Sequence, residues 1–387
     1  MIYNNLLLNK GIFDQLINYF KSDRIQNAYI FHGENGIGKE AHAIEFFAAM
    51  NCKNPLENYS GCGMCNSCIK IKSLQHELLT LTLPLPRGKQ ITNSDSPLKA
   101  LNNTQLDELT NQFKLKGNHP YLKIKLNKAN TILINSIKEI KKNISLSIPD
   151  NKYRLHLILD AEKLCYPKYE SANALLKILE EPTENNFFIL IVSDISKLLD
   201  TIKSRCSIIY FNPIEFDKHY NYLLNLNIDP EHAKIISKIS FGDISYSLEI
   251  AQKFENKMDH MNKIISSLLD NDLSKWKNQF TLLKDRDRVI ENLRFLNIFL
   301  RDIYNFKNTN DPNIINFSNF EKIVTEFSKK YSINFELCSN FINNAINNLN
   351  ANGYMPLMLS ALYIELFQVF KNKDSSILNY QSTANYN

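Results

Sequence analysis

One glycine-rich stretch constrains the fold of this chain more than any other feature. It reads Gly33-Glu34-Asn35-Gly36-Ile37-Gly38-Lys39-Glu40, with an apolar run at residues 28–32 before it and a helix-like segment at residues 40–50 after it. The stretch matches the pattern G-x-x-x-x-G-K-[ST] at every position except the last. In that pattern the glycines let backbone N–H groups surround phosphates, and the lysine neutralises the outer ones. The order strand, loop, helix therefore predicts a P-loop fold with Gly33, Gly36, Gly38 and Lys39 in its nucleotide site.

The last letter of the loop, Glu40, departs from the pattern. The expected serine or threonine hydroxyl would hold magnesium. A carboxylate is longer and places negative charge beside a polyphosphate, which Coulomb repulsion disfavours. The loop thus indicates the fold while arguing against ordinary nucleotide turnover.

Length and composition bound the class of protein. With 387 residues, 44% of them apolar, and only 10 glycines and 12 prolines, the chain is long enough for two or three domains. Residues 1–20 include Lys10 and Asp14 and so lack the uninterrupted apolar region of a signal peptide. No apolar run approaches a membrane span, so we expect a soluble, cytoplasmic protein with no membrane partner. The net charge of +5 is compatible with nucleic acid nearby but does not establish it.

Four of the seven cysteines form a compact cluster in the sequence. Cys52, Cys62, Cys65 and Cys68 have the spacing C-x9-C-x2-C-x2-C, which suits tetrahedral coordination of zinc by four thiolates. An iron–sulfur cluster and free thiols are the alternatives, but the upstream fourth cysteine and the lack of a following Cys-Pro favour zinc. Because the protein supplies all four ligands, the Zn2+ of this module, residues 52–68, is expected to be structural.

The next stretch, about residues 80–130, is interpreted as an insertion on the first domain. Residues 81–89 alternate like a strand until prolines interrupt them. Asp95-Ser96-Pro97 then predicts the start of a helix whose apolar side carries Leu98, Leu101, Leu106 and Leu109. We expect a solvated face, in preference to a nucleic-acid contact, for the lysines of this stretch: Lys114, Lys116, Lys123 and Lys125.

A second apolar strand, residues 153–159, ends at Asp160. In a chain with a P-loop, an aspartate at the carboxyl end of a buried strand is where the acid that orients magnesium belongs. The following residue would supply the carboxylate that activates water, but it is Ala161. Glu162 lies one position further along, where strand alternation should point its side chain elsewhere.

Helix and strand patterns continue to alternate after this point. A helix at 171–182 is stopped by proline, a buried strand covers 187–192, and a final strand covers 208–211. The alternation predicts a doubly wound parallel sheet with helices on both faces, occupying residues 1–210. Beyond Pro213 only helical periodicity remains, so the rest of the chain is expected to be all-α.

Several segments taken together resemble one family, the delta-prime subunits of bacterial DNA polymerase III clamp loaders, which are AAA+ proteins. The matching segments span most of residues 1–210, and they are residues 27–33 with 36–39, the four-cysteine module, 157–164, 173–182 and Ser204-Arg205-Cys206. The helical remainder fits by pattern only. The resemblance implies an α/β AAA+ domain, then an all-α lid at 211–256 and an all-α collar for oligomerisation at 257–373. The last residues, 374–387, are polar and are expected to form a disordered tail.

Residues that an active ATPase of this family carries are changed at three places. Such a subunit has Ser or Thr at position 40, Glu at position 161 and an arginine in the lid motif Gly-Asp-x-Arg, where this chain has Gly242-Asp243-Ile244-Ser245. Phosphoryl transfer depends on positioning and charge neutralisation, so the three changes together indicate a chain that is not an ATPase by itself. ATP binding is placed in doubt, although weak binding without turnover stays open because the loop glycines, Lys39 and Asp160 persist.

The resemblance also implies one retained functional arginine. In the family, the arginine of the Ser-Arg-Cys motif reaches into the nucleotide site of the neighbouring subunit, which assigns the role of a trans arginine finger to Arg205 and a loop-orienting role to Ser204. A planar, permanently charged guanidinium with five donors suits a γ-phosphate. An ordinary surface arginine is the alternative.

Three hypotheses of function follow. The first is a non-catalytic subunit of the DNA polymerase III holoenzyme that contributes Arg205 to a neighbouring ATPase and helps to load the sliding clamp onto primed DNA. Its implied partners are the gamma/tau ATPase subunits, the delta subunit and, through the complex, the clamp and primer–template DNA at a cytoplasmic, nucleoid-associated replisome. The second is an active ATPase of the gamma/tau type, which the four-cysteine module does not separate from the first. The third is a zinc-bearing nucleic-acid-binding protein whose P-loop is a relic.

Overall fold

The computed structural model of this chain describes residues 1–371 except 93, 182, 282, 284–285, 312–314, 316–319, 332 and 352. The tail predicted to be disordered, residues 374–387, lies outside the described residues. The chain divides into two compact units, one made of Met1–Tyr222 with Phe241–Leu248 and the other of Leu223–Ser240 with Glu249 onward. Among the described residues, no helix is both long enough and apolar enough to cross a membrane.

A five-stranded sheet forms the centre of the first unit. Its strands lie in the order β2-β3-β4-β1-β5, and every neighbouring pair is parallel. Strand β4 is buried along its whole length, as expected for a parallel sheet that is covered on both faces. The strand bounds are β1 (Ala28–His32), β2 (Leu79–Thr82), β3 (Arg154–Ile158), β4 (Asn186–Val192) and β5 (Ser207–Tyr210).

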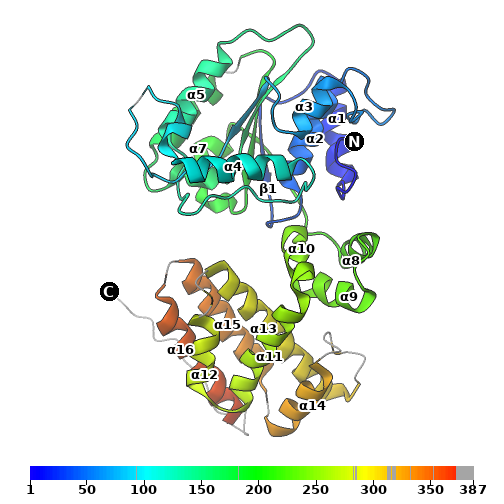
Figure 1. The fold of residues 1–387 in the computed structure, drawn as a ribbon, viewed down its shortest axis with the longest axis vertical. Coiled ribbons are helices and arrows are strands. Elements are labelled where there is room, and N and C mark those ends of the chain that lie inside the picture. The colour runs from blue at the N-terminus through cyan, green and yellow to red at the C-terminus, as the bar shows by residue number, and fades with distance from the viewer. Residues whose placement is uncertain are drawn as a thin grey trace. The chain divides into compact units, whose positions relative to one another are not determined.

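Helices cover both faces of this sheet, because alternate residues of each strand point to opposite sides. On one face, Ile30 of β1 packs in a buried cluster with Ile137 of α5 and Leu175 of α6. On the other, the rings of Phe187 in β4 and Phe46 in α2 have centroids 6.2 Å apart. Figure 1 shows α1, α2 and α3 grouped together, away from α5 and α7. The helices concerned are α1 (Lys10–Lys21), α2 (Lys39–Asn51), α3 (Asn66–Lys72), α5 (Ile134–Ile144), α6 (Glu170–Glu180) and α7 (Asp200–Lys203). The predicted parallel α/β sheet is confirmed.

Strand β2 ends at Thr82, because prolines 84 and 86 lack the N–H groups that a strand needs to continue, as the sequence predicts. One local prediction in the stretch 80–130 is wrong. The expected helix from Pro97 onward is two pieces, a 3-10 turn at Pro97–Ala100 and α4 at Asn103–Lys116. Asn102 caps α4 by accepting a hydrogen bond from the Gln105 backbone N–H at 2.8 Å and so starts a new helix there.

The second unit is helical throughout its described residues, which confirms the expectation of an all-α C-terminal part. Helices α8 and α10 run across the boundary between the two units. Trp276 of α12 is fully buried and donates its indole N–H to the Leu359 carbonyl of α16 at 2.9 Å. The helices are α8 (Phe216–Asn225), α9 (Pro230–Ile239), α10 (Ile244–Gln252), α11 (Phe254–Leu269), α12 (Leu273–Thr281), α13 (Arg286–Thr309), α14 (Glu321–Lys330), α15 (Phe335–Asn350) and α16 (Met355–Lys371). The division into a lid and a collar stays a prediction.

Candidate P-loop and four-cysteine sites

The P-loop follows β1 and meets the segments that follow β3 and β4. Carboxyl ends of neighbouring parallel strands share one edge of the sheet, so Asp160 after β3 and Ser193 after β4 border the same cavity as Lys39. The loop backbone needs its glycines: Gly33 and Gly36 have φ angles of 147° and 67°. A Cβ at Gly33 would lie 2.4 Å from the Phe211 carbonyl oxygen.

Lys39 is satisfied by its own loop. Its Nζ donates to the carbonyl oxygens of Gly33 at 2.6 Å and Glu34 at 2.5 Å, and the residue is only 5% exposed. Burial, followed by the positive charge of Lys123, lowers the pKa of Lys39 to about 8. The P-loop lysine is therefore folded back onto its own backbone.

The unexpected letter of the loop, Glu40, has a partner from a distant part of the chain. Its Oε2 lies 2.5 Å from the Nζ of Lys116, the last residue of α4. Lys116 is 2% exposed, and its Nζ also donates to the Leu122 carbonyl at 2.6 Å. The expectation that Lys116 belongs to a solvated face is wrong, because Lys116 is buried and pairs with Glu40, whose side chain is 15% exposed.

A second lysine of the same stretch pairs with the strand-end aspartate. Lys123 Nζ lies 2.9 Å from Asp160 Oδ1, and Lys163 Nζ lies 3.4 Å from Asp160 Oδ2. Burial opposes ionisation of Asp160, but the two ammonium groups outweigh it and hold the pKa of this carboxyl below its ordinary value. Lys123 is thus a second exception to the predicted solvated face, whereas Lys114 and Lys125 are exposed as expected.

Two further carboxylates lie at the site. Ile244 donates its N–H to the Gly36 carbonyl at 3.1 Å, and a Cβ at Gly36 would meet Asp243 Oδ1 at 1.7 Å. Burial raises the pKa of Asp243. Glu162 accepts from the Ser193 N–H at 3.4 Å, and its charge affects the pKa of Lys39.

The position of Glu162, which bonds Ser193 and is not among the residues that line the cavity, has a local reason other than strand alternation. The chain leaves β3 at Ile158, and Asp160 has a left-handed φ of 46° before a 3-10 turn at Ala161–Cys165. Strand alternation no longer applies to these residues. No local sequence pattern marks this change, and none marks the inward position of Lys116 or Lys123.

The cavity that these groups surround is about 40 Å³ in volume, and its lining includes Lys39, Glu40, Lys116, Lys123 and Asp160. Pockets for small-molecule ligands measure roughly 300–1,000 Å³. The residues present therefore do not fit the phosphates of a nucleotide with magnesium in this conformation. The cavity is lined by residues that the sequence predicts to lie together: Gly36, Gly38, Lys39 and Asp160. Side chains of the same chain, including Lys116 and Lys123, also line it.

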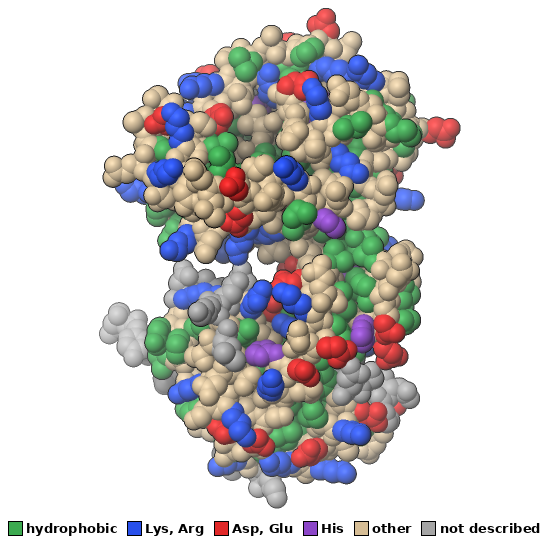
Figure 2. Space-filling view, in the orientation of Figure 1, with side chains coloured by type: hydrophobic (Ala, Val, Ile, Leu, Met, Phe, Trp, Pro, Cys, Tyr) green, Lys and Arg blue, Asp and Glu red, His purple; other side chains and the backbone are tan. Residues whose placement is uncertain are grey.

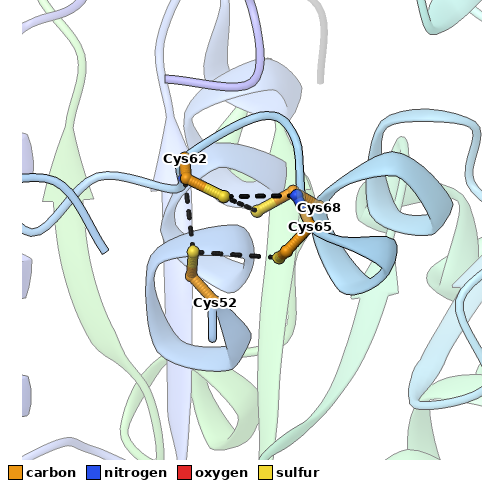
Figure 3. A group of neighbouring side chains, drawn as sticks. All are labelled: Cys52, Cys62, Cys65 and Cys68. Carbon is orange, nitrogen blue, oxygen red and sulfur yellow. Dashed lines mark hydrogen bonds between the residues drawn. The ribbon is translucent and has the colours of Figure 1, made fainter. Parts of the chain in front are cut away.

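The four cysteines converge at the end of α2 and the start of α3 (Figure 3). Their sulfur atoms all lie within 4.8 Å of one another, with Cys52 Sγ 3.9 Å from Cys65 Sγ and Cys62 Sγ 4.0 Å from Cys68 Sγ. Tetrahedral zinc with bonds of about 2.3 Å places its sulfur ligands about 3.8 Å apart. The donor set and spacing fit a four-thiolate metal ion.

Backbone groups support this cluster. The N–H of Cys62 donates to Cys52 Sγ and the N–H of Cys65 donates to Cys62 Sγ, each at 3.3 Å. Such donors favour the thiolate, which is the form that ligates metal. Backbone N–H groups thus already support two of the four sulfur atoms that would bind a metal ion.

Arg205 lies in the turn between α7 and β5. Its Nη2 is 2.7 Å from Glu180 Oε1, and its Nη1 donates to the Thr201 carbonyl at 2.9 Å. Ser204 donates to the same carbonyl at 3.1 Å, and its hydroxyl lies 3.5 Å from Arg205 Nη1. The arginine side chain stays 35% exposed, so part of the guanidinium faces solvent.

A P-loop on a parallel sheet, followed by helices and carrying a four-cysteine module, defines a member of the P-loop α/β class. A family model described as "DNA polymerase III, delta subunit" matches residues 8–215, more than half of the chain. The chain belongs to this family.

Individual relatives include more than one kind of subunit. DNA polymerase III subunit delta' of Bacillus subtilis is 23% identical over 248 residues, covering 64% of this chain and 60% of that protein. The delta' subunit of Buchnera aphidicola from Schizaphis graminum is 29% identical over 56% of this chain and 65% of its own length. The gamma subunit of the same organism is 24% identical over 65% of this chain and 57% of its own length.

This chain thus covers less than two thirds of the length of each of these relatives. A solved structure, a DNA polymerase III gamma subunit-related protein from Thermotoga maritima, is similar with a TM-score of 0.42 and 16% identity, covering 92% of this chain and all of that one.

Proposed function

We propose that this chain is a non-catalytic subunit of a DNA polymerase III clamp loader. In this role it contributes Arg205 to the ATP site of a neighbouring gamma/tau subunit and helps to load the sliding clamp onto primed DNA, together with a delta subunit. Membership of the family supports the assignment to the complex. The observation that carries the non-catalytic part is that Glu40 pairs with Lys116 and Asp160 pairs with Lys123, around a cavity of about 40 Å³.

The chemistry of the P-loop site supports this proposal. A nucleotide site needs unpaired positive charge for phosphates and an acid that activates water. Here Lys39 donates to its own loop, and position 161, next to Asp160, is alanine. The chain therefore lacks the arrangement from which it would cleave a phosphoanhydride bond.

The surroundings of Arg205 support the second part of the proposal. The guanidinium is partly exposed and Arg205 lies two residues before the start of β5, so its backbone is held while its tip faces outward. Arginine fingers raise phosphoryl-transfer rates by about 10³ to 10⁵. Ser204 binds the Thr201 carbonyl and thereby helps to hold the turn.

The test is ATP hydrolysis by the reconstituted complex with an Arg205→Ala subunit. Assembly should be unchanged while DNA-stimulated ATPase activity falls by at least about 10³ at the site that Arg205 completes. Arg24→Ala, which removes an exposed arginine elsewhere in the first unit, is the matched control. Activity equal to that of the control would remove the finger role.

The gamma/tau type of ATPase remains the second candidate, because a gamma relative matches this chain at 24% identity. It predicts steady ATP turnover by the isolated chain. A third candidate, an autonomous nucleic-acid-binding protein, predicts a salt-dependent gel shift without partners. On the face shown in Figure 2, basic and acidic side chains are interspersed on both units, which does not favour that third function.

A further inference from the structure

The stretch about 80–130 returns to the P-loop through a short segment, residues 116–123. Lys116 at one end pairs with Glu40, and Lys123 at the other end pairs with Asp160. These two carboxylates stand where the sequence pattern of a P-loop protein would place the groups around magnesium. The segment therefore brings two ammonium groups to the position of the cation.

The middle of the segment closes on the loop as well. Tyr121 is buried, and a Cβ at Gly38 would lie 3.1 Å from its Cε1 atom. Its hydroxyl accepts a hydrogen bond from the Leu7 N–H at 2.8 Å. The segment is thus attached at its two ends and at its centre.

Charges in this site balance within the chain. The carboxylates are Glu40, Asp160, Glu162 and Asp243, and the ammonium groups are Lys39, Lys116, Lys123 and Lys163. A polyphosphate would meet no surplus of positive charge and would have to separate pairs that are already formed. Entry of a nucleotide is opposed by electrostatics as well as by volume.

We infer that residues 116–123 are a built-in occupant of the P-loop site, in which Lys116 and Lys123 bind the carboxylates of Glu40 and Asp160 and lock the loop in a state independent of nucleotide. Glu40 then has two effects: it replaces the hydroxyl of the P-loop pattern, and it supplies the partner of Lys116. The inference assigns a role to the insertion, and it does not depend on Arg205 acting as a finger.

A double-mutant cycle on the full chain tests the pair. Lys116→Met leaves the carboxylate of Glu40 without its buried partner and should lower the Tm by several degrees, as should Glu40→Leu. The double variant should recover much of the loss, since an apolar pair of similar volume replaces the ion pair. Lys114→Met, at an exposed position two residues earlier on the same helix, should leave the Tm unchanged.

Additive losses in the cycle, or equal effects of Lys116→Met and Lys114→Met, would overturn the inference. Hydrogen exchange on the unaltered chain tests it without any variant. At millimolar Mg-ATP, amides at 33–40 and 116–123 should exchange at the same rates as without nucleotide. Protection of the loop together with faster exchange at 116–123 would show that the segment leaves, which contradicts a fixed occupant.

Glu40→Ser separates the occupant from a simple lost hydroxyl. This variant restores the P-loop pattern and removes the Glu40–Lys116 pair, but the segment stays attached through Lys123 to Asp160 and through the Tyr121 hydroxyl to Leu7, so Mg-ATP binding measured by calorimetry should remain absent. Recovery of binding by Glu40→Ser alone would contradict the inference. If the Lys116 and Glu40 variants are coupled but Arg205→Ala leaves the ATPase activity of the complex unchanged, only the role of Arg205 is removed. If the two variants are additive but Arg205→Ala abolishes that activity, only the role of residues 116–123 is removed.

Discussion

His156 illustrates how burial sets the charge of single residues in this chain. It lies inside the sheet, where its ring stacks on Phe188 with centroids 4.8 Å apart, and burial lowers its pKa to about 4. Burial also lowers the pKa values of His42 and His219 to about 4. All three are therefore neutral in the folded chain at neutral pH.

We predict that the free energy of unfolding decreases as the pH falls from about 6.5 toward 4. In this window the unfolded histidines bind protons that the folded ones do not, so each contributes a slope of about 1.4 kcal/mol per pH unit. Urea titrations at several pH values measure this slope. His156→Gln should reduce it by one histidine's share. A slope that His156→Gln leaves unchanged would contradict the prediction.

Gly36 is one of the P-loop positions at which a side chain would be strained and crowded. Its φ is 67°, and a methyl group there would lie 1.7 Å from Asp243 Oδ1. Gly36→Ala should lower the free energy of unfolding by about 1–3 kcal/mol, through left-handed strain and displacement of the carboxylate.

Gly11→Ala is the control for this prediction. Gly11 lies in the first turn of α1, where the added Cβ would be 3.7 Å from Asn9 Oδ1, an ordinary van der Waals contact. This change should be neutral or slightly stabilising. If Gly36→Ala has no larger effect in urea unfolding than Gly11→Ala, the loop does not require the glycine.

The four-cysteine module is the element whose folding should depend most on a bound ion. Cys65→Ser removes one of four thiolates and should abolish or strongly weaken zinc binding, measured by elemental analysis of the purified chain. Cys165→Ser, outside the cluster, should retain the same zinc content as the unaltered chain. Unchanged zinc in Cys65→Ser would mean that the ligands lie elsewhere, and iron in the unaltered chain would favour a cluster.

Sequence patterns predict those elements that are defined by near neighbours along the chain. The strand at 28–32, the loop and the following helix are local features, marked by an apolar run, the glycine pattern and a helix-like segment next to one another in the sequence. The convergence of four cysteines follows from their short spacing. These parts of the fold and the site could be predicted for that reason.

Other contacts join positions that no local pattern connects. Glu40 and Lys116 are 76 positions apart, and the sequence alone suggests a lost ligand at the first and a solvated lysine at the second. Their burial becomes evident only when α4 is placed over the loop. The leucine pattern continues through the break between the 3-10 turn and α4, so it does not predict the new helix start that the capping box of Asn102 creates.

At the scale of the whole molecule, the two units have separate cores, and the chain has a single tryptophan. Trp276 lies in the second unit, packed on Phe280 with ring centroids 4.7 Å apart. Its fluorescence therefore reports on the helical unit, whereas circular dichroism reports on both.

We predict that a zinc chelator moves only part of the thermal transition. The portion of the circular dichroism signal from the first unit should melt at a lower temperature, because the metal contributes to folding of its module. The Trp276 transition should stay in place. A parallel shift of both signals would show that the two units unfold as one cooperative body.

The ion pair between Arg205 and Glu180 has a consequence for the kinetics of assembly. Pairs that are partly open to solvent contribute only about 0.2–1 kcal/mol, so separating this one reduces an equilibrium by at most about fivefold. Glu180 therefore limits the conformations that the long Arg205 side chain samples, but binds it too weakly to prevent its release. In the proposed complex, exchange of Glu180 for a neighbour's phosphate then requires a rotamer change, which takes nanoseconds, and no rearrangement of the fold.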